Sequence, residues 1–327
     1  MFKHYIKGFV FAALCIFGFW VLQFIGGFLA ALPLGYGILK FKLNILQKPT
    51  PITPAIANRA GILTFFGDIF IFIVILLIIK FIFKKSLQND IKIKPFKLNK
   101  LAVLIPAALG SLMLASIWGS FFVQLIAKND KSIQMIHALF SEMHSPLAIL
   151  ATILIAPITE ELVFRGVLFN YLRRRIPFWP AVIISSVSFG ILHGNISQGV
   201  FAALLGIILA LMYAYTDSLI GDILVHILCN TTSTLLGFII ASNSINSSIK
   251  AEFSLLISLT YLLLGPVLVL LALNIYRKRN GSTKTIFKPL SIILFSTFIV
   301  FALIGTIGIV STSFKVSPSH TTIKVSS

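Results

Sequence analysis

The chain has 327 residues, of which 57% are hydrophobic and only 11% are charged. A soluble domain carries about 25% charged residues, so this composition excludes a protein whose whole surface faces water. The net charge of +18 does not indicate a nucleic-acid-binding protein, because the basic residues lie mostly between apolar segments. The positive-inside bias of membrane proteins and the attraction of anionic lipid headgroups explain these residues better.

Long apolar runs recur along the whole chain, and a membrane-spanning helix needs about 20 such residues. The runs predict an all-α, polytopic transmembrane bundle of about eight or nine spanning helices, two of them short. The predicted spans are residues 8–34, 62–83, 101–126, 147–170, 180–196, 199–216, 219–240, 253–275 and 289–313.

The first predicted span follows Lys3 and Lys7, is longer than a signal-peptide core and is expected to be retained. We divide the chain into three parts. N-terminal transmembrane helices and loops occupy residues 1–146, a core segment occupies residues 147–240, and C-terminal helices with a tail occupy residues 241–327.

Acidic residues inside the predicted spans are informative, because a carboxylate at mid-membrane is costly unless it is paired or lines a wet cavity. Four of the nine acidic residues fall there: Asp68, Glu160, Glu161 and Asp222. We interpret Asp68 as a polar lining residue or helix contact rather than a catalytic residue. We assign Asp222 to the start of the seventh span, where an acidic side chain suits the helix dipole.

Glu160 and Glu161 are adjacent in the fourth predicted span. Adjacent residues of a helix point about 100° apart, so these carboxylates cannot share one face and are expected to need different partners. Glu161 and Arg165 are spaced i, i+4, close enough for an ion pair that lowers the cost of burying both. Glu160 has no local partner, so it has to find one on another helix, to be protonated or to contact water.

Two histidines, His193 and His226, lie in later spans, and His226 shares a helix face with Asn230. The turn between the fourth and fifth spans is expected near Ile176, about equally far from Glu160 and His193. An antiparallel hairpin would therefore bring these two residues to similar depth as a water-activating pair. His226 lies early in its span, so one helix has to be kinked, tilted or partly interfacial to bring it there. A structural Glu–His pair or an ion path remains an alternative.

Three segments together resemble the motifs of the CPBP family, which contains CaaX prenyl proteases and bacteriocin-processing proteins. The resemblance covers about residues 147–240 and implies an all-helical intramembrane endopeptidase with its site in a chamber within the membrane. The matching segments are Glu160-Glu161-x-x-x-Arg165, Phe189-x-x-x-His193 and His226-x-x-x-Asn230.

The resemblance implies a role for each residue. Glu160 would be the general base that activates water, and His193 would help to hold that water or a metal ion. His226 and Asn230 would stabilise the oxyanion of the tetrahedral intermediate, or His226 would ligate a metal. Supporting residues would maintain the geometry or pack beside the site: Glu161, Arg165 and Phe189.

The participation of a metal stays open in the sequence. No HExxH motif is present, which would place two histidine ligands on one helix face. A zinc ion held by Glu160, His193 and His226 would have three protein ligands and one open position. A metal-free mechanism, in which Glu160 and His193 polarise the water, is equally consistent.

The sequence therefore predicts an intramembrane protease that uses Glu-activated water on a hydrophobic or membrane-associated peptide, with CaaX-like and bacteriocin-related substrates included. The alternatives are a non-catalytic bacteriocin-immunity or scaffold protein and an ion- or proton-coupled transporter. The expected partners are a peptide or protein substrate in the membrane and anionic lipids, without nucleic acid. The abundance of Lys, Ile, Asn and Phe is typical of a bacterial protein, so we expect a location in the bacterial cytoplasmic membrane.

Overall fold

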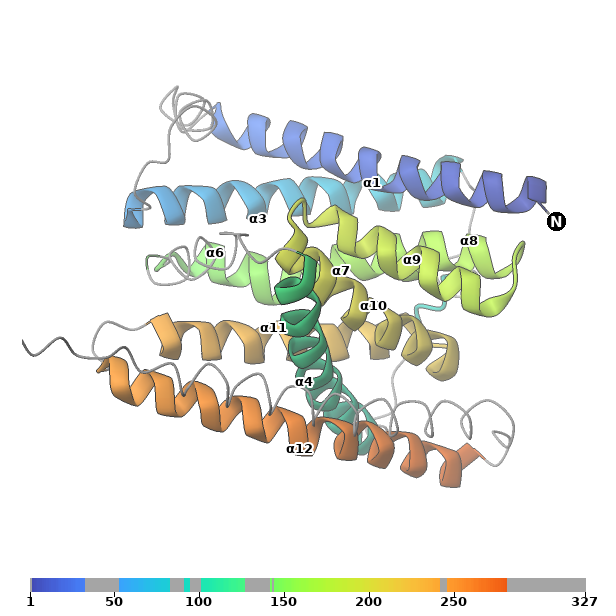
Figure 1. Ribbon diagram of the computed structural model, residues 1–327. Helices are drawn as coiled ribbons and strands as arrows, with labels where there is room; N and C mark the ends of the chain where they lie inside the picture. The colour runs from blue at the N-terminus through green and yellow to red at the C-terminus, as the bar shows by residue number, and fades with distance from the viewer. Residues whose placement is uncertain are drawn as a thin grey trace, which may run out of the picture. The chain divides into compact units, whose positions relative to one another are not determined.

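The computed structural model describes residues 2–32, 53–82, 91–94, 101–126, 142, 144–241 and 246–280. The chain divides into two units, Met1–Arg279 and Asn280–Ser327, and almost all of the described residues belong to the first. The regular structure of the described ranges is entirely helical (Figure 1), which confirms the predicted all-α fold.

Helices of the N-terminal part begin and end as follows: α1 Phe2–Ala31, α3 Pro54–Leu77 with the π-helical turn η1 Ile78–Ile82, and α4 Leu101–Ile126. A continuous helical stretch comes next, in which α-helical and π-helical turns alternate: α6 Pro146–Leu150, η3 Ala151–Ile155, α7 Ala156–Glu161, η4 Leu162–Phe169 and α8 Asn170–Arg173. The last four helices are α9 Phe178–Leu192, α10 Ile196–Thr216, α11 Leu219–Ala241 and α12 Ser247–Asn280.

Six helical stretches among the described residues are long and apolar enough to cross a membrane. They are Phe2–Ala31, Pro54–Phe81, Ile105–Val123, Pro146–Arg173, Ile196–Ala214 and Leu219–Ile239. The polytopic bundle is thereby confirmed, with a count somewhat below eight or nine.

Two predicted spans are shorter than a full crossing, and a third falls outside the description. The span predicted at 180–196 is the 15-residue helix α9. The apolar part of α12 is only Leu256–Val269. The span predicted at 289–313 and the tail lie outside the described residues, and the three-part division of the chain stays a prediction.

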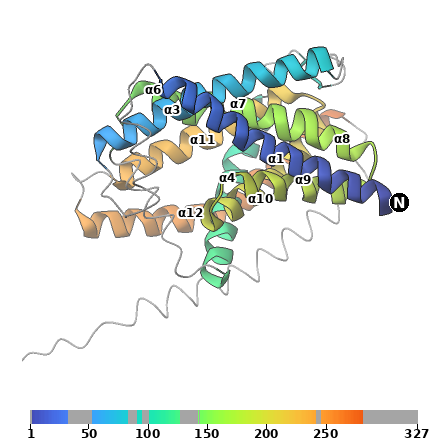
Figure 2. The ribbon, with the colours of Figure 1, turned by 90° about the horizontal axis from the view of Figure 1, so that it is seen from above.

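The helices pack around a core in which aromatic side chains from α1, η4, α9 and α10 meet. Helix α1 packs against both α3 and α9, and Figure 2 shows α1 running across this region from above. The opposite side of α1 leaves large apolar side chains more than half exposed, among them Phe9, Leu14 and Phe17. Such a surface is unfavourable in water and suits a lipid environment.

A sharp turn between α9 and α10 positions one end of the site. Helix α9 ends at Leu192, and Gly194 adopts φ 68°, a left-handed conformation that glycine reaches at little cost. Asn195 then caps α10, because its Oδ1 accepts a hydrogen bond from the Gln198 backbone N–H at 2.8 Å. His193 is therefore held at the junction of two helices.

Candidate active site

The predicted ion pair between Glu161 and Arg165 is present and completely buried. Arg165 Nη1 donates to Glu161 Oε1 at 2.9 Å, and both side chains are 0% exposed. Arg165 Nη2 donates to the Gly206 carbonyl of α10 at 3.2 Å. The guanidinium carbon also lies 4.6 Å from the centroid of the Phe189 ring, a cation–π contact. Arg165 thus ties three helices together beside Glu161.

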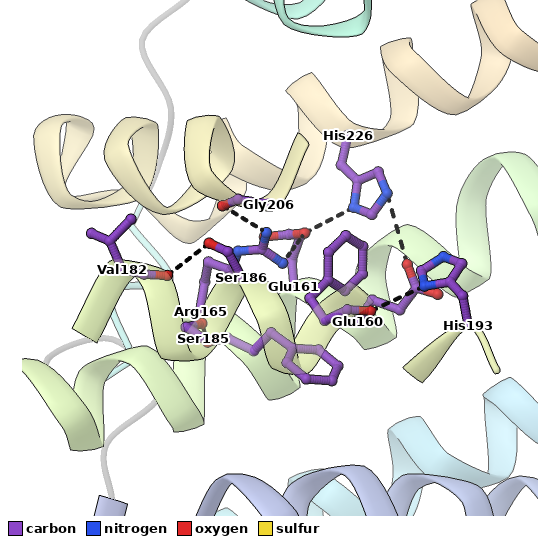
Figure 3. A network of polar contacts seen from close by, with 11 residues as sticks. Glu160, Glu161, Arg165, Val182, Ser185, Ser186, His193, Gly206 and His226 are labelled. Atoms are coloured by element: carbon purple, nitrogen blue, oxygen red, sulfur yellow. Dashed lines mark hydrogen bonds and ion pairs between the residues drawn. The ribbon is translucent and has the colours of Figure 1, made fainter. Parts of the chain in front are cut away.

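His226 joins the two adjacent glutamates (Figure 3). Its Nδ1 lies 2.8 Å from Glu161 Oε1, and its Nε2 lies 3.7 Å from Glu160 Oε2. Glu161 thus has Arg165 as its own partner and Glu160 finds one on another helix, as expected, but the two carboxylates also share His226. An imidazole carries nitrogens on opposite edges of its ring, so a single histidine can reach two side chains that point in different directions. Its early place in α11 does not keep His226 from Glu160.

His193 is fixed by its own helix end. Its Nδ1 lies 3.0 Å from the Phe189 carbonyl, which can only accept a hydrogen bond, so Nδ1 is the donor and Nε2 is the nitrogen left for another partner. The His193 carbonyl accepts from Asn195 Nδ2 at 3.1 Å, and the Leu192 carbonyl accepts from Trp20 Nε1 at 2.8 Å. Trp20 belongs to α1, so a helix outside the predicted core segment fixes the end of α9.

Glu160 and His193 both line a pocket of about 400 Å³. Small side chains form the wall that α3 and the helical stretch from α6 to η3 contribute. Apart from Glu160 and His193, the polar side chains that line the pocket are uncharged. The other lining residues are Phe19, Gln23, Ala57, Ala60, Gly61, Thr64, Ala148, Ala151, Thr152, Leu192 and Gln198. The predicted hairpin therefore does bring Glu160 and His193 to one chamber.

Asn230 lies one turn after His226 on α11, as the spacing predicts. Its Nδ2 donates to the Thr152 carbonyl at 3.0 Å, and Thr152 lines the pocket. The amide carries two N–H groups, so one remains for another acceptor when the first is used in this way. Asn230 is thus not among the residues that line the pocket, but it bonds the backbone of one that is.

The candidate ligands for zinc do not fit a metal ion in this arrangement. Within the described part of the chain, no three His, Cys, Asp or Glu side chains are grouped so that they could hold one. The Phe189 ring contacts both imidazoles, with its centroid 5.2 Å from the His193 ring and 5.6 Å from the His226 ring.

The two remaining intramembrane acids are both buried. Asp68 accepts a hydrogen bond from Gln23 Nε2 at 3.3 Å, which agrees with its interpretation as a helix contact. Asp222 lies in the first turn of α11, as predicted, but it is only 1% exposed and lies against Glu161. The contact with Glu161 was not predicted from the sequence, although Asp222 and His226 have the same i, i+4 spacing that indicated the Glu161–Arg165 pair.

The fold and the site together define a class of protein. It is a helical membrane protein with a buried cluster of glutamate, histidine and arginine beside a pocket. Residues 142–232 match the family model "Type II CAAX prenyl endopeptidase Rce1-like". The chain is also 27% identical over 187 residues to "Putative membrane peptidase YdiL" of Bacillus subtilis (strain 168), which covers 55% of this chain and 73% of that relative.

The comparison with solved structures gives no significant match. The family model and the bacterial relative together support the CPBP family, so the resemblance seen in the three motifs is confirmed. The chain is an integral membrane protein.

Proposed function

We propose that the protein is an intramembrane endopeptidase in which Glu160 activates the attacking water. The observation that carries this proposal is the position of Glu160, which lines the pocket and at the same time lies 3.7 Å from His226 Nε2. A carboxylate between a substrate-sized cavity and an imidazole can take a proton from water and pass it on. The family model and the bacterial relative, both named for peptidases, support the same reaction class.

The reaction needs a nucleophile, an oxyanion donor and a proton for the leaving group. A water molecule held by Glu160 and by His193 Nε2 gives its proton to Glu160, and its oxygen attacks the carbonyl carbon of the peptide. The C–N bond then breaks, and the proton on Glu160 moves to the departing amine nitrogen. Water thereby adds across the peptide bond, and Glu160 returns to its starting state.

The oxyanion that forms during the attack requires hydrogen-bond donors, each worth about 3 kcal/mol in such a site. We assign this role to His226, as an imidazolium whose Nδ1–H is bonded to Glu161, and to the free N–H of Asn230. Glu161 stabilises the imidazolium and fixes its orientation, as the carboxylate of a hydrolytic triad does.

The pocket favours an uncharged, largely apolar peptide. Its volume of about 400 Å³ falls within the about 300–1,000 Å³ typical of small-ligand pockets. Gln23, Thr64, Thr152 and Gln198 supply uncharged polar groups that can bond the backbone of an extended peptide. A charged substrate side chain would find no opposite charge there except Glu160, so we propose membrane-associated apolar segments, including CaaX-like peptides, as substrates.

The test is cleavage of a quenched fluorescent library of apolar and prenylated peptides by the purified full chain in detergent. Glu160→Gln, which keeps the shape of the side chain, should abolish cleavage while the protein stays folded. Glu252→Gln is the matched control, because it removes an exposed carboxyl of α12 far along the chain from the site. Cleavage by Glu160→Gln at the wild-type rate would refute the mechanism.

The same preparations test the role of metal and the other functional classes. Activity that survives chelation, in protein that metal analysis finds free of metal, would support the glutamate–histidine mechanism. Activity that is lost on chelation and returns only with zinc would contradict it. If no peptide is cleaved by the folded wild type, the scaffold, immunity or transport alternatives replace the peptidase.

A further inference from the structure

Asp222 is a completely buried acid that the proposed mechanism does not use. Its side chain is in contact with Glu161, which is 0% exposed. Glu161 Oε1 receives two hydrogen bonds, from Arg165 Nη1 at 2.9 Å and from His226 Nδ1 at 2.8 Å. Its other oxygen, Oε2, and both oxygens of Asp222 have no hydrogen-bond donor among the described residues.

Three acceptor oxygens without a donor are costly in a spanning segment, because no bulk water is present to bond them. Arg165 Nε also lacks a partner, so this donor makes no hydrogen bond with any of the three oxygens. Two ionised carboxylates in contact would in addition repel each other in surroundings of low dielectric constant. A single proton between the two acids removes the repulsion and satisfies Glu161 Oε2 at the same time.

The charge balance of the buried group formed by Glu161, Arg165 and Asp222 also favours a protonated Asp222. Arg165 balances Glu161, with which it forms a buried ion pair. An ionised Asp222 would then leave one uncompensated negative charge within the membrane, which is strongly unfavourable. A neutral Asp222 leaves this group balanced.

We propose that Asp222 is a carboxylic acid that donates a hydrogen bond to Glu161 Oε2 and thereby positions His226. With Oε2 held by Asp222, Glu161 keeps Oε1 directed at both Arg165 and His226. Asp222 is thus a positioning residue that acts on the histidine through Glu161. This role rests on the proposed peptidase function where activity is concerned, whereas the protonation state is independent of it.

Infrared spectroscopy of the purified full chain tests the protonation state directly. A protonated carboxyl group gives a C=O stretching band that shifts on exchange into heavy water, and an ionised one does not. We expect this band to lose intensity in Asp222→Asn and to be unchanged in Glu252→Gln. Identical spectra of the wild type and Asp222→Asn would overturn the proposal, even if the protein proved to be no peptidase.

Kinetics test the positioning role. Asp222→Asn still offers an N–H donor to Glu161 Oε2, so its kcat and pH profile should stay close to the wild type. Asp222→Leu offers none, and we expect kcat to fall about 10- to 100-fold with little change in KM, as for residues that orient a functional histidine from one step away. A loss in Asp222→Asn as deep as in Asp222→Leu would show that the negative charge matters and would refute the proposal.

Discussion

Glu161 Oε1 and His226 Nδ1 lie 2.8 Å apart, although 65 residues separate them in the chain. The contact joins the two motifs that the sequence shows only as separate i, i+4 pairs, and it orients the imidazole toward Glu160. The consequences of disturbing this contact differ from those of removing Glu160, because Glu161 holds a buried arginine as well.

We predict that Glu161→Ala loses both stability and activity. The change leaves the Arg165 guanidinium buried without its counter-ion, and removing one partner of a buried ion pair costs about 3–5 kcal/mol. Thermal unfolding in detergent and peptide cleavage should therefore both be affected. Glu160→Gln is the comparison, because it should alter cleavage alone. An unchanged melting temperature in Glu161→Ala would contradict this prediction.

Asp68→Asn should change cleavage little. Asp68 contacts α1 through Gln23 Nε2, and the carbonyl of an asparagine can accept the same hydrogen bond. Asp68 is not among the residues that line the pocket. Cleavage rates of Asp68→Asn and the wild type, measured on the same peptide, provide the check, and a loss comparable with that of Glu160→Gln would make Asp68 part of the reaction.

Asp217, between α10 and α11, predicts a dependence of stability on pH. Burial raises the pKa of its carboxyl, but hydrogen bonds and charges from Lys94 and Lys92, at 2.9 and 3.2 Å, outweigh this effect and hold the pKa below its ordinary value. A lowered folded-state pKa stabilises the protein above the unfolded pKa of about 3.9, and this contribution disappears as pH falls through the folded pKa.

Asp217→Asn is the matched variant, because asparagine tolerates the φ of 50° at this position. The wild type should unfold at a somewhat higher temperature than Asp217→Asn at pH 7, and the difference should shrink as the pH falls below about 3.9 and vanish below the folded-state pKa. The effect is small because the side chain is 45% exposed. A difference that grows on acidification would contradict the sign of the pKa shift.

Gly61→Ala should narrow the pocket and strain the contact between α3 and α6. A methyl group at Gly61 would collide with the Cβ of Ala148, and both residues line the pocket. We expect a loss of about 1–3 kcal/mol in stability, the usual cost of overpacking, and a lower kcat/KM. The double variant Gly61→Ala with Ala148→Gly removes the nearer clash and leaves only the Ala148 Cα, at 2.8 Å, in the way of the new methyl group. It should therefore restore part of the stability and of kcat/KM, and no recovery would contradict the steric explanation.

The segments of apolar sequence determined the membrane-spanning helices, because a run of about 20 apolar residues has few stable alternatives to a helix in lipid. Helix α4 occupies residues 101–126, as predicted. Local spacing also determined the Glu161–Arg165 pair, since residues four apart lie on one helix face.

Only the tertiary structure decided which helices bring their polar groups together. His226 reaching both glutamates, Trp20 bonding the end of α9 and Asp222 lying against Glu161 all join residues that are distant in sequence or on different helices. Periodicity gives the face on which a side chain lies but not the helix that it meets, because both the buried and the exposed sides of these helices carry large apolar side chains. The buried polar contacts determine which helices are neighbours, and these contacts form only when the helices are packed.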